Sequence, residues 1–390
     1  MKKHDKAAFD LVMKMMAIPG QSAEEGEIAD FVQKQLLAAG ADPRAIQFDT
    51  AHKRTPVQGE VGNMIFKLPG SSRGSRRMLM AHLDTVPICV GSQPVRKGNL
   101  VRSANPKTGL GADDRAGAAV ALNAALRILK DDLPHPPLTF FWTVQEETGL
   151  QGARCASIGK LGKPQLAFNF DGGSPDKLTI GATGGYRMEI NIHGIASHAG
   201  GAPERGVSAI AIAALAIADL QRSGWHGDIC KNGKHGTSNV GILNGGHATN
   251  VVTDHVFVKA EARSHDAKFR QKIIREMESA FQRAAKELTN VDGKRGNVVI
   301  NGQLDYDAFS LSPEEPCVTA ASEAVAAAGL EPNLAIANGG VDANWMVKHG
   351  IPTVTIGAGQ LNQHMVSEAL DIQKYLAACD IGLRLATTTT

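Results

Sequence analysis

Short, continuously apolar runs that alternate with helical stretches constrain this chain more than any other feature of its sequence. The runs are bounded by Gly, Pro or polar residues and predict strands, while alanine-rich stretches such as residues 115–130 and 314–330 predict helices between them. Strands that are apolar on both faces are typical of a parallel sheet covered by helices. We therefore predict an α/β fold with a mostly parallel mixed sheet sandwiched by helices. The predicted strands are residues 63–68, 77–83, 138–144, 166–170 and 353–356.

The middle of the chain follows a different pattern. Residues 186–193 alternate apolar and polar side chains, as a strand with one exposed face does. The order that follows completes the sequence strand, helix, two strands, helix, strand, which is the ferredoxin-like pattern. We expect residues 184–307 to form an inserted ferredoxin-like α+β lid domain, and residues 1–183 and 308–390 to form one discontinuous α/β domain. The later elements are a helix at 208–222, strands at 239–243 and 255–262, a helix at 267–288 and a strand near 298–303.

An early helix has recognisable signals at both ends. Ser22 and Glu25 have the spacing of a capping box ahead of an apolar stretch at residues 28–39. Gly40 is suited to the position just after the last turn. The sequence therefore predicts a helix of about four turns here.

Charge and cysteine content exclude several classes of protein. Forty-one Lys and Arg against 39 Asp and Glu leave a net charge of +2, which is too balanced for a nucleic-acid-binding surface. Five cysteines without C-x-x-C spacing suggest neither a disulfide framework nor a thiolate zinc site, so we expect a reducing, cytoplasmic location. The longest apolar stretch, residues 209–218, has about half the length of a membrane span. We expect no nucleic-acid or membrane partner.

Histidines and acidic residues gather where the apolar runs end. In open α/β sheets, ligands bind beyond the carboxyl ends of the strands, so these distant segments can converge on one crevice. A single such residue is more often a turn residue than a ligand, and the prediction depends on their co-occurrence. Two histidines and several carboxylates without cysteine suit zinc, manganese or cobalt. The residues are His82, Asp84, Glu146, Glu147, Asp171 and His364, with Asp113 and Asp114 at the start of a helix.

The segments AHLDTVP, GLGADDRAG, QEETGLQGA and FNFDGG, together with the late His364, resemble the motifs of a known family. This is the family of co-catalytic di-zinc peptidases that includes peptidase T, carboxypeptidase G, carnosinase and acetylornithine deacetylase. The resemblance covers nearly the whole chain, and DDRAG and NGGVDANWM favour the peptidase T-like branch. It implies a metallopeptidase that cleaves an amide bond of a short peptide with two divalent metal ions per chain, zinc first, with cobalt or manganese as alternatives.

The resemblance also implies roles for individual residues. Asp113 would bridge the two metal ions, and the peptide bond after it would be cis. His82 and Asp171 would complete one metal site, while Glu147 and His364 would complete the other. Asp84 would hold the ligand imidazole in its tautomer.

Further implied roles concern the reaction and the substrate. Glu146 would be the general base. His198, in the lid, would polarise the scissile carbonyl, often across a homodimer interface formed through the lid. From the residues alone, His198 is an exposed loop histidine and Arg263 a surface arginine paired with Asp266. The substrate contacts would be His198, Asn250, Arg263, Asn338 and Gly339.

Rival interpretations differ in how much they conflict with the sequence. Residues 70–74, GSSRG, match a serine-hydrolase elbow around Ser72, but a strand follows where a helix is needed, which predicts a hairpin turn instead. A non-catalytic binding protein would lack Glu146 or a metal ligand, and all are present. A deacylase of N-acyl amino acids would keep the same ligands and stays open. Asn338 stands where peptidase T has Arg, so selection of a free amino end also stays open.

Overall fold

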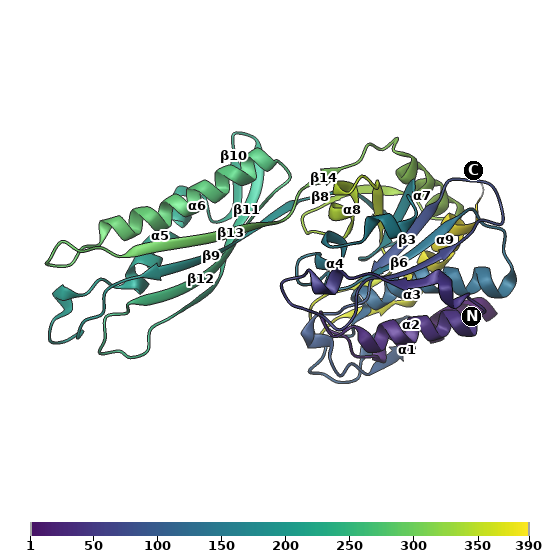
Figure 1. Cartoon of the computed structure of the whole chain (residues 1–390), viewed down its shortest axis with the longest axis horizontal. Coiled ribbons are helices and arrows are strands. Elements are labelled where there is room, and N and C mark those ends of the chain that lie inside the picture. Colours follow the sequence, from purple (N-terminus) through teal and green to yellow (C-terminus); the bar gives the residue numbers. More distant parts are fainter. Residues whose placement is uncertain (1, 389–390) are drawn as a thin grey trace. The chain divides into compact units, whose positions relative to one another are not determined.

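The computed structural model describes residues 2–388 and divides the chain into two compact units (Figure 1). The larger unit joins the N-terminal segment up to Ala182 to the C-terminal segment from Ser310, and the smaller unit spans Thr183–Phe309. The expected boundaries at residues 184 and 307 fall one and two residues inside the smaller unit. The outermost ends of the predicted α/β domain, residues 1 and 389–390, lie outside the described residues.

A nine-stranded mixed sheet forms the centre of the larger unit, with strand order β1-β2-β6-β3-β7-β16-β8-β14 and β15 paired to β8. Strands β6, β3, β7 and β16 are mutually parallel. Strand β2 runs antiparallel to β1 and β6, whereas β8 is antiparallel to β16 and parallel to β15. The predicted α/β fold is confirmed, and the strands of this sheet that were not predicted are β1, β8, β14 and β15. The strands are β1 (Ile46–Phe48), β2 (Met64–Leu68), β3 (Arg77–His82), β6 (Leu138–Thr143), β7 (Leu166–Phe170), β8 (Lys177–Ala182), β14 (Phe309–Ser310), β15 (Asn333–Ala337) and β16 (Thr353–Ile356).

Helices cover both faces of this sheet, which explains why every residue of β3 and β6 is buried. On one face, Trp142 Nε1 donates a hydrogen bond to the Ala118 carbonyl of α3 (3.2 Å). On the other face, Met78 and Met80 pack in a cluster with Met346 of α8. The two faces of the sheet therefore pack against different helices. The helices of the unit are α1 (Lys3–Ala17), α2 (Gly26–Ala38), α3 (Ala112–Asp131), α4 (Gln151–Arg154), α7 (Pro316–Ala327), α8 (Ala343–Lys348) and α9 (Ile372–Thr387).

The first turns of α3 lie against the end of β7. A Cβ atom on Gly117 would lie 1.9 Å from the Phe170 carbonyl oxygen, so only glycine permits this approach. The close contact brings the start of α3, with Asp113 and Asp114, to the carboxyl end of the sheet.

A second, four-stranded sheet joins two distant parts of the larger unit. Its order is β17-β18-β5-β4, and β18 pairs antiparallel with β5. The segment that carries His364 lies between β17 and β18, so this pairing brings it beside the chain that leads into α3. The strands are β4 (Pro94–Lys97), β5 (Leu100–Ser103), β17 (Gln360–Leu361) and β18 (Ala369–Asp371).

The smaller unit has a five-stranded antiparallel sheet of order β10-β11-β12-β9-β13. Its buried core lies between one face of the sheet and helices α5 and α6. Without β10 the order is that of the predicted ferredoxin-like pattern, and β10 extends it as a hairpin with β11. The elements are β9 (Gly184–His193), α5 (Ala209–Ser223), β10 (Gly227–Lys231), β11 (Lys234–Gly245), β12 (His255–Ser264), α6 (Ala267–Glu287) and β13 (Asn297–Tyr306).

Two local predictions are wrong. The predicted capping box of Ser22 and Glu25 does not form: Ser22 Oγ donates instead to Asp84 (2.6 Å), and the Glu25 carboxylate accepts from the amide of Gln145 (2.9 Å). Both side chains turn away from the helix to meet buried partners. The amide of Gly26, at the start of α2, donates to the Glu60 carboxylate instead (3.0 Å). Residues 70–74 form no hairpin, because β6 lies between β2 and β3 in the sheet.

None of the described helices combines the length and apolarity needed to cross a membrane.

Candidate metal centre

The carboxyl ends of the parallel strands bring the predicted metal ligands together. Possible ligand atoms of His82, Asp113 and Asp171 lie within 4.8 Å of one another, and so do those of Asp113, Glu147 and His364. His82 ends β3, Asp171 directly follows β7, and Glu147 follows β6. Asp113 belongs to both groups, which we call the two triads.

The geometry of Asp113 suits a bridge between two cations. Its Oδ1 lies 3.3 Å from His82 Nε2, and its Oδ2 lies 3.3 Å from His364 Nε2. His364 Nε2 is also 2.9 Å from Glu147 Oε1. Asp113 Oδ1 is buried and accepts no hydrogen bond from any described residue, although buried polar atoms normally have a partner. The triads therefore fit two divalent ions, each with three protein ligands.

Burial, neighbouring negative charges and contacts between imidazoles and carboxylates shift the pKa values of the triad residues. Burial, together with the negative charge of Asp113, raises the pKa of Asp171 to about 7. Hydrogen bonds to Asp113 and Glu147 raise the pKa of His364 to about 10. Burial alone would raise the pKa of Asp113, but the neighbouring imidazoles of His364 and His82 outweigh it and lower that pKa. Such a concentration of buried carboxylates calls for positive charge.

Asp84 contacts His82 of one triad and the backbone of Glu147 of the other. The Nδ1 atom of His82 lies 3.0 Å from the Asp84 backbone carbonyl and 3.4 Å from its carboxylate, so the backbone makes the shorter contact. The carboxylate itself accepts hydrogen bonds from the amides of Glu146 (2.9 Å) and Glu147 (3.1 Å) and from Ser22 Oγ. Asp84 thus orients the imidazole and also fixes the turn that carries both glutamates.

Glu25 accepts a hydrogen bond from the amide of Gln145, the residue before Glu146. The sequence did not predict Glu25 as a site residue. Its Oε1 accepts from the amide of Gln145, a residue with φ of +54°. Together with Asp84, it receives the amides of three consecutive residues, 145–147. Burial, then the charge of Asp84, raises the pKa of Glu25 to about 8. The Ser22–Glu25 spacing concealed this role, because it matched a helix cap.

Asp114 and Asp342 are further buried carboxylates around the triads. The bond between Asp113 and Asp114 is cis, as the resemblance implies. Asp114 accepts hydrogen bonds from the His82 amide (3.2 Å) and from Gln360 Nε2 (2.7 Å). Asp342 accepts from the Thr143 hydroxyl, and burial raises its pKa to about 6. Asp342 lies in the NGGVDANWM segment, so its motif was visible but its role was not.

The other predicted substrate contacts are not all in one unit. Asn338 and Gly339 lie in an exposed segment after β15 of the larger unit. His198, Asn250 and Arg263 belong to the smaller unit, where the Ala199 amide donates to the Asn250 carbonyl (2.9 Å) and keeps the first two segments together.

Arg263 has a different partner from the one expected. Its guanidinium makes two hydrogen bonds of 2.9 Å to the carboxylate of Glu261, while Asp266 caps α6 and pairs with Lys234. The alternative pairing of Arg263 with Asp266 is therefore wrong.

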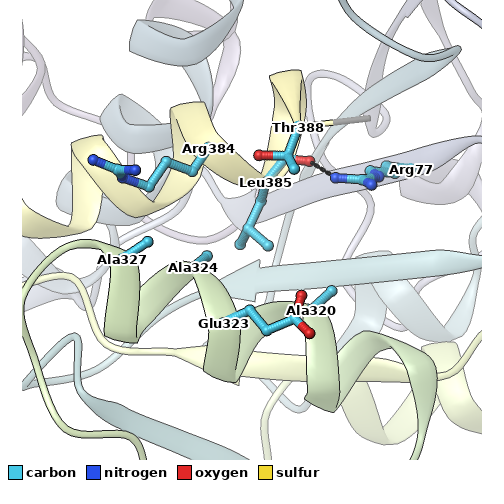
Figure 2. Close-up of a pocket in the computed structure, with 8 residues that line it drawn as sticks. All are labelled: Arg77, Ala320, Glu323, Ala324, Ala327, Arg384, Leu385 and Thr388. Atoms are coloured by element: carbon cyan, nitrogen blue, oxygen red, sulfur yellow. Dashed lines mark hydrogen bonds between the residues drawn. The ribbon is translucent and has the colours of Figure 1, made fainter. Parts of the chain in front are cut away.

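The pocket in Figure 2 is separate from the triads. It has a volume of about 150 Å³ and lies between α7 and α9, with Arg77 at one edge. Arg77 Nη1 donates to the Leu385 carbonyl (2.7 Å). Arg77 begins β3 whereas His82 ends it, so the pocket and the triads lie at opposite ends of that strand.

Comparison with known proteins adds independent information. Residues 78–388 match the model of peptidase family M20/M25/M40. The uncharacterized protein YqjE of Bacillus subtilis (strain 168) is 29% identical over 381 residues, which is 97% of each chain. The crystal structure of a tripeptidase from Staphylococcus aureus subsp. aureus Mu50 has a TM-score of 0.87 at 28% identity. That of aminopeptidase PepT from Bacillus cereus ATCC 10987 has a TM-score of 0.82 at 29% identity, and both matches cover 98% of each chain.

The first prediction concerns metal stoichiometry. After equilibration with zinc or cobalt, the protein should hold about two ions per chain, as two-metal sites do. Asp113→Asn should lose more than one of them, because Asp113 is common to both triads. Asp132→Asn, at the exposed end of α3, is the matched control and should keep both ions. Retention of two ions by the Asp113 variant, measured by elemental analysis, would contradict the bridge.

The second prediction concerns Glu25 and pH. Because its folded-state pKa of about 8 lies above the unfolded value of 4.5, the folded protein binds the extra proton between these values. The free energy of unfolding should therefore fall as pH rises from about 4.5 to 8, by at most about 1.4 kcal/mol per pH unit from this group. In Glu25→Gln that decline should be shallower. Denaturant titrations of both metal-free proteins across this range check it, and parallel declines would refute it.

Proposed function

The chain belongs to peptidase family M20/M25/M40, and from this premise we propose that it is a two-metal hydrolase that cleaves the peptide bond of a short peptide. The observation that carries the proposal is the pair of triads that share Asp113, with Glu146 beside the ligand Glu147 but outside both triads. Similarity to a tripeptidase and an aminopeptidase over 98% of each chain supports a peptide substrate.

We propose zinc as the bound metal, with cobalt or manganese as alternatives. Two such ions, when bound, would polarise the scissile carbonyl and lower the pKa of the attacking water. His82 and Asp171 would hold one ion, Glu147 and His364 the other, and Asp113 both.

Glu146 is the residue we assign to proton transfer. Amide hydrolysis needs a group that takes a proton from the attacking water and delivers it to the leaving nitrogen. The Glu146 side chain lies in a position that is only 8% exposed, and burial raises its pKa well above the usual range. A carboxyl group with a raised pKa holds a proton more tightly. Glu146 can therefore keep the proton between its transfer from the water and its transfer to the leaving nitrogen. The hydrogen bond from the Glu146 amide to Asp84 fixes the backbone that carries the Glu146 side chain.

His198 is the residue we assign to the carbonyl oxygen of the substrate. Its Nδ1 accepts hydrogen bonds from the amides of Gly200 (3.1 Å) and Gly201 (2.8 Å). In the neutral ring the proton is therefore on Nε2, which becomes the donor. A donor suits an oxygen that gains negative charge during the reaction. A homodimer formed through the lid stays a prediction.

The remaining substrate contacts are proposals with different support. Arg263 would bind a substrate carboxylate only by exchanging it for Glu261, since that carboxylate already occupies its guanidinium. Asn250, Asn338 and Gly339 are exposed and offer uncharged polar groups. With Asn338 in place of an arginine, this position carries no charge toward either substrate terminus.

The third prediction separates the roles of the two neighbouring glutamates. Glu146→Gln should keep both metal ions but lose about 10²- to 10⁴-fold in kcat, or roughly 3 to 5 kcal/mol of transition-state stabilisation. Glu147→Gln should instead weaken one metal site, and excess metal should restore part of its activity. Metal content and kcat are measured for both variants. Should excess metal rescue the Glu146 variant and not the Glu147 variant, the two assignments would be exchanged.

The fourth prediction tests the substrate class. We expect the zinc- or cobalt-loaded protein to hydrolyse unmodified di- or tripeptides faster than N-acetylated amino acids. Release of free amino groups is followed for both sets of compounds, and chelator-treated protein serves as the control. Faster cleavage of the acetylated amino acids would replace the peptidase proposal with the deacylase alternative on the same metal centre.

A further inference from the structure

A buried carboxylate outside both triads, Glu368, holds the loop that leads into Asp113. We infer that Glu368 is a positioning residue for the metal centre, which fixes the bridging Asp113 through its backbone. The inference deepens the proposed function and rests on it for the role of Asp113. Glu368 itself ligates no metal in this scheme.

The contacts of Glu368 are unusually concentrated. Its Oε2 accepts hydrogen bonds from the amides of Leu110 (2.8 Å) and Gly111 (2.7 Å), and its Oε1 accepts from the amide of Asp113 (2.9 Å). The Cys89 thiol donates a weaker hydrogen bond to Oε2 (3.4 Å). Glu368 is 1% exposed, so these donors replace the water that a free carboxylate would bind.

The loop is shaped around this carboxylate. A Cβ atom on Gly109 would lie 3.0 Å from Glu368 Oε2 and 2.9 Å from Cys89 Sγ, so the missing side chain leaves the room that the carboxylate uses. Three of the five residues from 109 to 113 donate their amides to it. The backbone position of Asp113 is therefore determined by Glu368 on one side and by the start of α3 on the other.

Glu368 also connects the bridging residue to a second ligand. It lies four residues after His364, and the segment between them is tightened by a hydrogen bond from the Glu368 amide to the Met365 carbonyl (3.0 Å). One short segment thus presents His364 to Asp113 Oδ2 and holds the Asp113 amide. A shift of this segment would move both ligands of one triad together.

A carboxylate suits this task better than its amide. Both oxygens of Glu368 accept, and four donors point at them, whereas glutamine would turn an NH₂ group toward one set of donors. An unsatisfied or opposed buried donor is destabilising, so the loop in Glu368→Gln should move away. Misplacement of Asp113 would weaken the metal site without removing a ligand.

The fifth prediction tests this positioning role. In Glu368→Gln, the affinity for zinc or cobalt should fall about 10- to 100-fold, as for other residues that orient metal ligands. The kcat measured without added metal should fall and should recover with excess metal, while KM for the peptide stays near the wild-type value. Glu331→Gln, which changes an exposed glutamate of the same unit, is the matched control and should leave the affinity unchanged.

The outcomes are distinguishable from failure of the proposed function, because chelator competition measures metal affinity without a substrate. If no peptide is cleaved but Glu368→Gln binds metal more weakly, the positioning role stands and the peptidase proposal fails. Wild-type affinity in a folded Glu368→Gln overturns the inference. If that variant does not fold, hydrogen exchange in the metal-free wild type decides: slow exchange at the amides of residues 110, 111 and 113 supports the inference, and fast exchange overturns it.

Discussion

Burial of negative charge at the carboxyl edge of four parallel strands is the constraint on which the larger unit depends. Asp113, Asp114 and Glu146 are all buried there, beside two imidazoles. Removing carboxylates from water is strongly unfavourable unless cations or hydrogen-bond donors replace the water. The unit supplies both kinds of compensation and keeps them apart. The carboxylates of the triads converge with two imidazoles in ligand sets that suit metal ions, whereas Asp84, Asp114 and Glu368 accept backbone amides.

The amides explain how loops without regular structure can hold a precise site. Asp84 and Glu25 together receive the amides of residues 145–147, and Glu368 receives three amides from residues 110–113. Hydrogen bonds from an amide to an ionised carboxylate such as that of Asp84 are stronger than those between neutral groups. The loops that carry Asp113 and Glu147 are therefore fixed through their main chains, and the side chains of these two residues are left free to bind a metal ion.

The sequence supports prediction of the strands and triads but not of the residues behind them. The central strands are buried on both faces, so their apolar runs are visible, and residues after parallel strands must meet at one edge. Glu368 and Glu25 hold amides that are distant in sequence, and an amide leaves no mark in the residue type that carries it. Strand β10 was missed for a related reason, because a short, half-exposed edge strand lacks an apolar run.

Arg115 shows why Asp84 and Glu25 need not depend on metal ions for compensation of their negative charge. It is 1% exposed, and burial lowers its pKa to about 10, so it keeps its charge at neutral pH. Attraction to Asp84 and Glu25 opposes the effect of burial, and Nη2 of Arg115 lies 3.3 Å from the carbonyls of Ile18 and Gly20. A permanent cation thus interacts with Asp84 and Glu25, and exchangeable cations would bind at the triads. Loss of the metal ions would then remove positive charge from the triads only. Asp84 and Glu25, which hold the loop that carries Glu147, would keep the positive charge of Arg115.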